Sequence, residues 1–354
     1  MLLTGKMPVL RDALAGTLQT AIATTAKMKV RILTALSFAP IATQTLNPDS
    51  RKDSITTGHN VTSAIGTPNA KYCVWEPFTE FRGVPEMKHV VVPTLFCISL
   101  VGAAGCRGPV EIIAHRGASY QAPENTMAAV QLAWQKRANV EVDVYLSKDN
   151  RMVVIHDAST KRTAGVDLKV KATNSDQLRA LDVGSFKASR FAGERIPLLA
   201  EVLESIPPKQ KLYIEIKCGK EILPALRQLL AESGKMSQIV IIGFDLETVA
   251  QSKKLIDVPT YWLKGTDKDK QTKQWIPHDA KLVQTAKANG LDGLDVDYAG
   301  VTEEFAHAVH TSGLKLYVWT VDDPQEARRL VKLGVDGITT NRPDWLREQL
   351  QNKQ

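Results

Sequence analysis

From about residue 110 onwards, short runs of β-forming residues alternate with amphipathic helical stretches. This alternation extends over about 240 residues and favours a parallel α/β fold. Nine runs have the length and composition of strands: Glu111–His115, Val140–Leu146, Met152–His156, Lys211–Lys217, Gln238–Phe244, Thr260–Leu263, Gly293–Asp297, Lys315–Val321 and Gly337–Thr340. Helical patterns lie between most of them, for example Glu124–Lys136, Leu198–Ser205, Ile222–Glu232, Leu246–Leu255, Ala280–Asn289, Thr302–His310 and Pro324–Leu333.

The second and third strand candidates are separated only by Ser-Lys-Asp-Asn-Arg (147–151), which is too short for a crossover between parallel strands. One of these two candidates is therefore expected to form a hairpin appendage, which leaves eight parallel strands. Eight βα units predict a TIM-type (β/α)8 barrel over residues 109–351. A doubly wound open sheet is the alternative, but no Gly-x-Gly-x-x-Gly follows the first strand.

The residues before the barrel look like a leader. Residues 1–86 are rich in Thr, Ala and Ser without a sustained pattern, and we expect them to be disordered. At 87–106 a Met-Lys-His start, an apolar run and Gly-Ala-Ala-Gly-Cys106 have the parts of a secretory signal. Because a signal is expected at the start of a protein, Met87 is the preferred start codon, which would leave residues 1–86 untranslated; Met28 is a rival start.

The end of this segment resembles a bacterial lipobox, although Ala103 stands where Leu is usual. The resemblance implies that Cys106 is lipidated and that the protein is exported to the cell envelope, as a periplasmic or membrane-anchored lipoprotein. The alternative is a buried apolar strand or helix in front of the barrel, which would leave the protein cytoplasmic.

The net charge of +7 invites the hypothesis of an anionic macromolecular partner. Residues 1–105, however, hold ten basic and six acidic residues, so that more than half of the excess belongs to the leader. No block of five like charges occurs. We therefore expect no nucleic-acid partner.

Three carboxylates stand on two of the predicted strands. Glu141 and Asp143 are two residues apart and so point to the same face, and Glu215 lies on the next strand of the barrel. Like charges inside a barrel require a cation, and oxygen ligands suit Mg²⁺ or Ca²⁺. The alternative is a set of solvent-facing residues at exposed strand ends.

Basic side chains end the same strands. His115 and His156 each close an apolar run, and two imidazoles can act as general base and general acid near neutral pH. Asp157 could orient one of them or cap the following turn. Arg116 offers a planar fork suited to a phosphate, and Lys217 shares the face of Glu215.

Together these motifs resemble the glycerophosphodiester phosphodiesterase family. The resemblance rests on His-Arg-Gly-Ala-Ser-Tyr-Gln-Ala-Pro-Glu-Asn-Thr (115–126), Glu-Val-Asp-Val (141–144), His-Asp (156–157), Glu-Ile-Lys (215–217), Tyr-Val-Trp-Thr-Val (317–321) and Gly-Ile-Thr-Thr-Asn-Arg-Pro-Asp (337–344). It implies a barrel with a small insertion after the second barrel strand, at about residues 146–206.

The resemblance also implies roles for individual residues. These are a Ca²⁺ or Mg²⁺ site at Glu141, Asp143 and Glu215, an acid/base pair at His115 and His156, and substrate contacts at Arg116, Lys217, Glu124 and Trp319. The chain departs from the family in having Asn341 where Asp is common, and Arg-Ala-Asn (137–139) where Gly-Ala-Asp is common.

The expected activity is hydrolysis of a glycerophosphodiester to sn-glycerol 3-phosphate and an alcohol. Two alternatives remain open at this point. One is lysophospholipase D-like hydrolysis of a membrane lipid, which a lipidated Cys106 would place near a bilayer. The other is a non-catalytic barrel that binds phosphodiesters.

Overall fold

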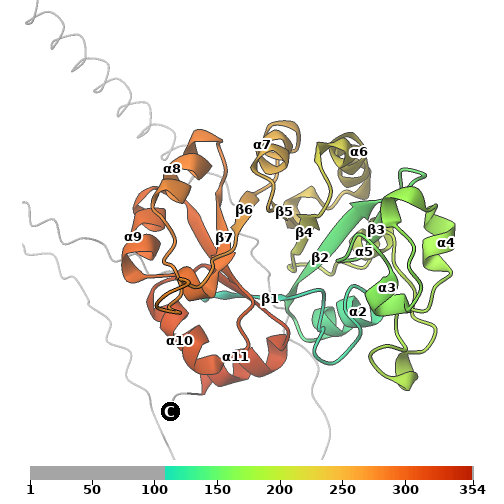
Figure 1. Ribbon diagram of the computed structural model, residues 1–354, viewed down its shortest axis with the longest axis horizontal. Helices are drawn as coiled ribbons and strands as arrows, with labels where there is room; N and C mark the ends of the chain where they lie inside the picture. Colours follow the sequence, from blue (N-terminus) through green and yellow to red (C-terminus); the bar gives the residue numbers. More distant parts are fainter. Residues whose placement is uncertain (1–107, 353–354) are drawn as a thin grey trace, which may run out of the picture. The chain divides into compact units, whose positions relative to one another are not determined.

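The structure is a computed structural model that describes residues 108–352. Within these residues nine strands form one sheet in the order β1-β9-β8-β7-β6-β5-β4-β2-β3, and a further pairing of β1 with β2 closes it (Figure 1). The strands are β1 (Glu111–Ala114), β2 (Asn139–Leu146), β3 (Met152–Val154), β4 (Leu212–Ile216), β5 (Ile239–Gly243), β6 (Thr260–Lys264), β7 (Gly293–Asp297), β8 (Lys315–Trp319) and β9 (Gly337–Thr340). All pairings are parallel except β2 with β3, so the described chain is a closed (β/α)8 barrel, as predicted.

The predicted hairpin appendage is β3, which pairs antiparallel with the end of β2 through Leu146 and Met152. The chain between β2 and β4 also holds the short helices α3 (Lys161–Ala164), α4 (Ser175–Arg179) and α5 (Leu199–Glu204). Part of this segment has an apolar cluster of its own, which includes Val153 and Leu178. This confirms the insertion after the second barrel strand.

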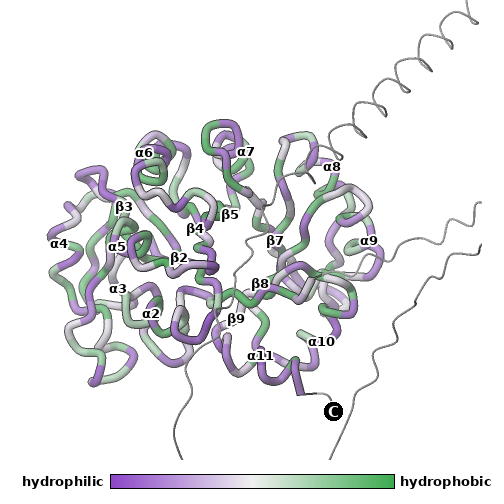
Figure 2. Tube along the Cα trace, turned by 180° about the vertical axis from the view of Figure 1, so that it is seen from behind, coloured by the Kyte–Doolittle hydropathy of each residue, from purple (hydrophilic) through white to green (hydrophobic). Residues whose placement is uncertain are grey.

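Seven further helices of the described part cover the barrel: α2 (Met127–Gln135), α6 (Leu223–Ser233), α7 (Leu246–Leu255), α8 (Lys281–Ala288), α9 (Glu303–Thr311), α10 (Pro324–Lys332) and α11 (Pro343–Gln351). Thr126, Asp245, Thr302 and Asp323 accept hydrogen bonds from backbone amides at the starts of their helices, which satisfies groups that the helix leaves unpaired. Hydrophobic and hydrophilic residues alternate along these helices (Figure 2), because one face of each packs on the barrel.

Side-chain alternation along the strands divides the core into two parts. Val140, Val142 and Val144 of β2 pack outwards in the cluster that includes Trp134 of α2. The alternate residues point into the barrel, where Tyr213, Tyr261 and Tyr317 pack together in one cluster. The rings of Tyr261 and Tyr317 stack with centroids 4.8 Å apart. The next inward residues on the same strands are Glu215, Leu263 and Trp319, which line one cavity. The aromatic layer therefore forms the floor of that cavity.

The predictions for residues 1–86, for the signal at 87–106 and for lipidation of Cys106 lie outside the described residues and stay predictions. Among the residues described, none of the helices has the length and apolar character needed to cross a bilayer.

Candidate active site

The polar side chains singled out from the sequence gather where the parallel strands end. His115 and Arg116 directly follow β1, His156 lies just after β3, and Lys217 directly follows β4. They line a cavity of about 120 Å³. The cavity is lined by His115, Arg116, Glu141, His156, Glu215, Lys217, Ile242, Phe244, Leu263, Asp295, Trp319 and Thr339. Of the other predicted site residues, Asp143 and Glu124 contact this lining through Arg116.

A larger cavity of about 690 Å³ lies beside the start of β1, around Val110, Arg328 and Leu350. It contains none of the predicted site residues. Within residues 108–352 one group of side chains could hold a metal ion, and two of its members, Glu141 and Glu215, line the smaller cavity. The chemistry of the lining, and not the cavity volume, therefore indicates the site.

Three buried carboxylates form the centre of the site. The parallel register of β2 and β4 places Asp143 directly opposite Glu215, and Glu141 lies one inward position earlier on β2. Each of the three offers an oxygen within 4.8 Å of the other two. Oε1 of Glu141 and Oδ1 of Asp143 are buried and have no hydrogen-bond partner among the described residues. Unpaired, enclosed carboxylate oxygens fit a hard divalent cation such as Ca²⁺ or Mg²⁺.

The pKa values of Glu141 and Glu215 also favour a bound cation. Burial raises the pKa of Glu141 well above its ordinary value, and repulsion from Asp143 and Glu215 adds to the shift. Burial and the charge of Asp143 raise the pKa of Glu215 to about 7, although Lys217 counteracts them. The Lys217 Nζ donates to Oε1 of Glu215 over 2.7 Å and lies 3.6 Å from Oδ1 of Asp143.

Two neighbours hold the carboxylates in place. Asn125 donates through its side-chain amide to Oδ2 of Asp143 over 2.8 Å, and the backbone amide of Arg116 donates to Oε2 of Glu141 over 2.8 Å. The loop that carries Arg116 requires glycine at position 117. Its φ is 78°, and a Cβ there would come within 2.6 Å of the backbone of Ala129. The sequence reasoning assigned no role to Asn125, although it stands in the quoted Pro-Glu-Asn-Thr run.

Each predicted catalytic histidine has its Nδ1 in a hydrogen bond. Nδ1 of His115 lies 2.8 Å from Oδ1 of Asn341, and Nδ1 of His156 lies 2.6 Å from Oδ1 of Asp157. Burial lowers the pKa of His115, and the charge of Arg116 lowers it further. Both imidazoles therefore have their Nε2 atoms free of these contacts, which leaves those atoms available for proton transfer.

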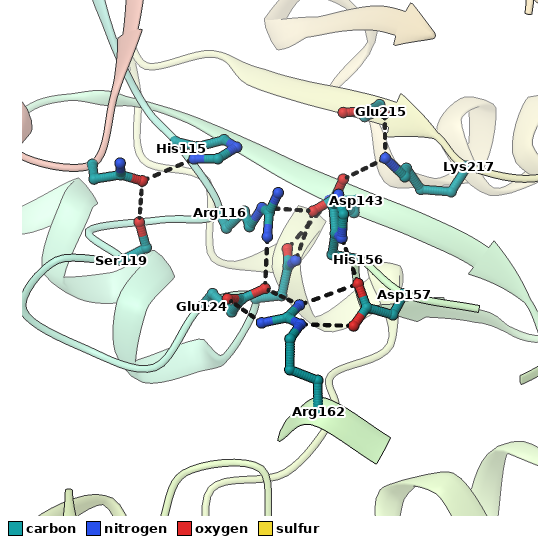
Figure 3. A network of polar contacts seen from close by, with 12 residues as sticks. His115, Arg116, Ser119, Glu124, Asp143, His156, Asp157, Arg162, Glu215 and Lys217 are labelled. Carbon is teal, nitrogen blue, oxygen red and sulfur yellow. Dashed lines mark hydrogen bonds and ion pairs between the residues drawn. The ribbon is translucent and has the colours of Figure 1, made fainter. Parts of the chain in front are cut away.

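Arg116 and Glu124 belong to an ion-pair network on one side of the carboxylates (Figure 3). Nη1 of Arg116 donates to Glu124 over 2.8 Å, and its Nε lies 3.4 Å from Oδ2 of Asp143. Arg162 of α3 donates to both oxygens of Glu124 at 2.8 Å and through Nε to Asp157 at 2.7 Å. Burial opposes ionisation of Glu124, but Arg162 and Arg116 outweigh it and lower its pKa to about 2.

This network was only partly foreseen. The family resemblance implied a substrate contact for Glu124; in the structure its carboxylate lies outside the triad and pairs with two arginines. Arg162 was missed, because nothing in the local sequence of the insertion indicates that it reaches two residues of the site.

Part of the cavity lining is aromatic or aliphatic. Phe244 follows β5 and Trp319 ends β8, and their rings meet edge to face with centroids 5.6 Å apart. The indole Nε1 of Trp319 donates to the backbone oxygen of Asp295 over 3.2 Å. The cavity lining thus combines charged side chains with aromatic and aliphatic ones.

Comparison with known proteins agrees with this geometry. The model of the glycerophosphoryl diester phosphodiesterase family matches residues 115–345, which contain all the site residues described above. The chain belongs to this family. It is therefore an enzyme that hydrolyses phosphodiesters, and the prediction of a glycerophosphodiester phosphodiesterase is confirmed at this level.

Individual relatives of the family match about two thirds of this chain over nearly their whole length. A glycerophosphodiester phosphodiesterase of Caldanaerobacter subterraneus is 34% identical over 244 residues, covering 66% of this chain and 95% of the relative. One of Bacillus altitudinis is 31% identical, covering 66% of this chain and 95% of the relative. The structure of a phosphodiesterase of Oleispira antarctica in complex with the product sn-glycerol-3-phosphate is similar with a TM-score of 0.60 and 26% identity, covering 68% of this chain and 97% of that chain.

The family is metal-dependent, and the buried carboxylate triad is the group in the described chain that can hold a metal ion.

Proposed function

We propose that this phosphodiesterase hydrolyses glycerophosphodiesters to sn-glycerol 3-phosphate and an alcohol by acid/base catalysis with two histidines. The observation that carries the proposal is the pair of imidazoles, each held through Nδ1, at the rim of one cavity with three buried carboxylates. The product-bound relative from Oleispira antarctica supports the choice of product.

Glu141, Asp143 and Glu215 would hold one Ca²⁺ or Mg²⁺ ion. Such an ion, when bound, stabilises negative charge on the phosphoryl oxygens and lowers the pKa of the attacking hydroxyl or water. Arg116 and Lys217 line the same cavity, so their side chains are placed to bind the remaining phosphoryl oxygens.

The histidines move the protons. Nε2 of one histidine removes the proton of the nucleophile as its oxygen forms a bond to phosphorus. Nε2 of the other histidine donates a proton to the alcohol oxygen as its bond to phosphorus breaks. The hydrogen bonds to Asn341 and Asp157 fix the ring orientations that both transfers need.

The test is release of glycerol 3-phosphate from glycerophosphocholine by the wild-type protein, His115→Ala and His156→Ala, with and without a chelator. We expect both substitutions and the chelator to lower kcat by about 100-fold or more, as is typical for loss of a general acid or base. His307→Ala, on the exposed face of α9, is the matched control and should keep full activity. Activity that survives both substitutions and the chelator would contradict the mechanism.

A further inference from the structure

One buried acidic group lines the active-site cavity but has no part in the mechanism above. Asp295 lies in the middle of β7, paired in register with Leu263 of β6 and Tyr317 of β8. Its side chain is 2% exposed, and it is among the residues that line the cavity. Its atom Oδ1 is enclosed and has no hydrogen-bond partner within residues 108–352.

Asp295 is separate from the metal-binding group. The three carboxylates of that group lie within 4.8 Å of one another, and Asp295 is not among them. Its surroundings in the cavity lining include Ile242 and Leu263, which cannot hydrogen-bond. Burial raises its pKa well above the ordinary value, and Glu215 raises it further. A carboxyl group accepts hydrogen bonds in either form and can also donate one when it is protonated, so a hydroxyl is a suitable partner for both forms.

An enclosed polar atom without a partner is destabilising, so it is found where a ligand completes its hydrogen bonding. The ligand that fits this buried carboxyl group is an uncharged hydroxyl, because an anion would be repelled by the nearby carboxylates and a cation would favour the triad. Trp319 is anchored to the backbone of the same residue, so its indole lies next to this position.

We propose that Asp295 is a specificity-determining residue whose carboxyl group hydrogen-bonds a hydroxyl of the polyol half of the substrate. The inference rests on the proposed function, since it assumes that the glycerol moiety enters this cavity. It predicts that the enzyme distinguishes glyceryl from simple alkyl phosphodiesters by a hydroxyl contact and not by size.

The experiment measures binding of sn-glycerol 3-phosphate and of propyl phosphate to the Ca²⁺-loaded and the Mg²⁺-loaded enzyme by calorimetry. Propyl phosphate keeps the phosphate and the carbon chain but lacks both hydroxyls. The wild-type protein should bind sn-glycerol 3-phosphate about 10 to 100 times more tightly, since a site built around a hydroxyl rejects the analogue without it. Equal affinities in the wild-type protein would overturn the proposal without any variant.

Asp295→Leu should remove the preference by weakening only the binding of sn-glycerol 3-phosphate. Asp295→Asn, which keeps the shape and a hydrogen-bonding head group, should retain most of it. If Asp295→Leu does not fold, the smaller Asp295→Val replaces it. Equal losses for both ligands would show a structural role and overturn the proposal.

Hydrolysis of glycerophosphocholine by the same wild-type preparation separates the two hypotheses. Absence of hydrolysis would contradict the proposed function. Hydrolysis without a preference for the hydroxylated ligand would overturn only the role of Asp295.

Discussion

The imidazole Nδ1 of His115 lies 2.8 Å from the side-chain oxygen of Asn341, and that asparagine is itself clamped by Asp322. Asp322 accepts hydrogen bonds from the side-chain amide of Asn341 over 2.7 Å and from its backbone amide over 2.9 Å. These bonds fix the amide with its oxygen towards His115 and Ser119. The amide oxygen can only accept, so Nδ1 of His115 carries a hydrogen and Nε2 is the free base.

The first prediction concerns the charge at position 341, next to His115. Asn341→Asp would place a second carboxylate beside Asp322, without the side-chain amide group that donates to Asp322 in the wild-type protein. The added negative charge next to Nδ1 of His115 favours the imidazolium form. We expect the limb of the pH–rate profile that His115 controls to move to higher pH by about 1 unit. Burial lowers the pKa of His115 in the wild-type protein, so the shift starts from a histidine that is neutral at pH 7.

The measurement is the pH dependence of kcat/KM for glycerophosphocholine. Asn341→Leu serves as the companion variant, because it removes the hydrogen bond without adding a charge. It should lower kcat without moving the profile upwards. An unchanged profile in Asn341→Asp would mean that His115 does not control either limb.

The second prediction concerns Arg162, which joins the loop after β1 to the insertion. Its guanidinium bonds to Glu124 and to Asp157, and Asp157 in turn bonds to His156. Without Arg162, Glu124 and Asp157 would lose the cation that they share. Asp157 would then hold the imidazole of His156 less firmly in its orientation. Arg162→Ala should therefore lower kcat by about 10-fold, an effect typical of a mispositioned catalytic group.

Arg162→Lys tests whether charge alone is enough. Lysine offers a point charge and cannot bond Glu124 and Asp157 in the same forked geometry. We expect partial recovery at most, measured as kcat and KM separately. Arg227→Ala, on the exposed face of α6, is the matched control and should leave both constants unchanged.

The third prediction concerns the carboxylate triad without its cation. Burial and then repulsion within the triad raise the pKa of Glu141 and of Glu215, so ionised carboxylates are unfavourable there in the metal-free fold. In the wild-type protein, saturating Ca²⁺ or Mg²⁺ should raise Tm by several degrees, because the ion binds only the folded state.

Glu215→Gln removes one of these charges and one anionic ligand. We expect the metal-free variant to be at least as stable as the metal-free wild type, and the rise in Tm on adding the ion to be largely lost. Calorimetric scans with and without the ion check both statements. A variant that keeps the full rise would exclude Glu215 as a ligand.

The sequence predicted the fold and the centre of the site because both depend on local periodicity. Alternation along β2 and β4 put Glu141, Asp143 and Glu215 on the inner face. His115 follows the parallel strand β1, whereas His156 reaches the same cavity through the antiparallel hairpin of β2 and β3. The helix α11 was not named from the sequence; it begins at Pro343, within the quoted 337–344 motif.

The supporting residues depend on contacts between distant segments, which periodicity does not report. Arg162 reaches back 38 positions to Glu124, and Asn341 lies 226 positions from His115. The position of Asp295 on the inner face of its strand could have been predicted from the sequence. The run Gly-Leu-Asp-Val-Asp (293–297) places Asp295 and Asp297 two residues apart on a strand, as Glu141 and Asp143 are.

The last prediction concerns stability in acid. Asp336 accepts from Lys315 over 2.7 Å and from the backbone amide of Leu316 over 2.9 Å, and His310 lies 3.4 Å away. Burial raises the pKa of Asp336, but these partners outweigh it and lower the pKa to about 2. Because the folded-state pKa lies below the ordinary value of 3.8, the ionised group stabilises the fold above about pH 4. This contribution is lost as the pH falls from about 4 to about 2.

Asp336→Asn should therefore lower the free energy of unfolding at pH 7 by about 2 kcal/mol, and the difference from the wild-type protein should shrink towards pH 2. Urea titrations at a series of pH values measure it. Asp257→Asn, at an exposed position between α7 and β6, is the matched control and should change stability little at any pH. A difference that stays constant from pH 7 to pH 2 would show that Asp336 acts through packing and not through its charge.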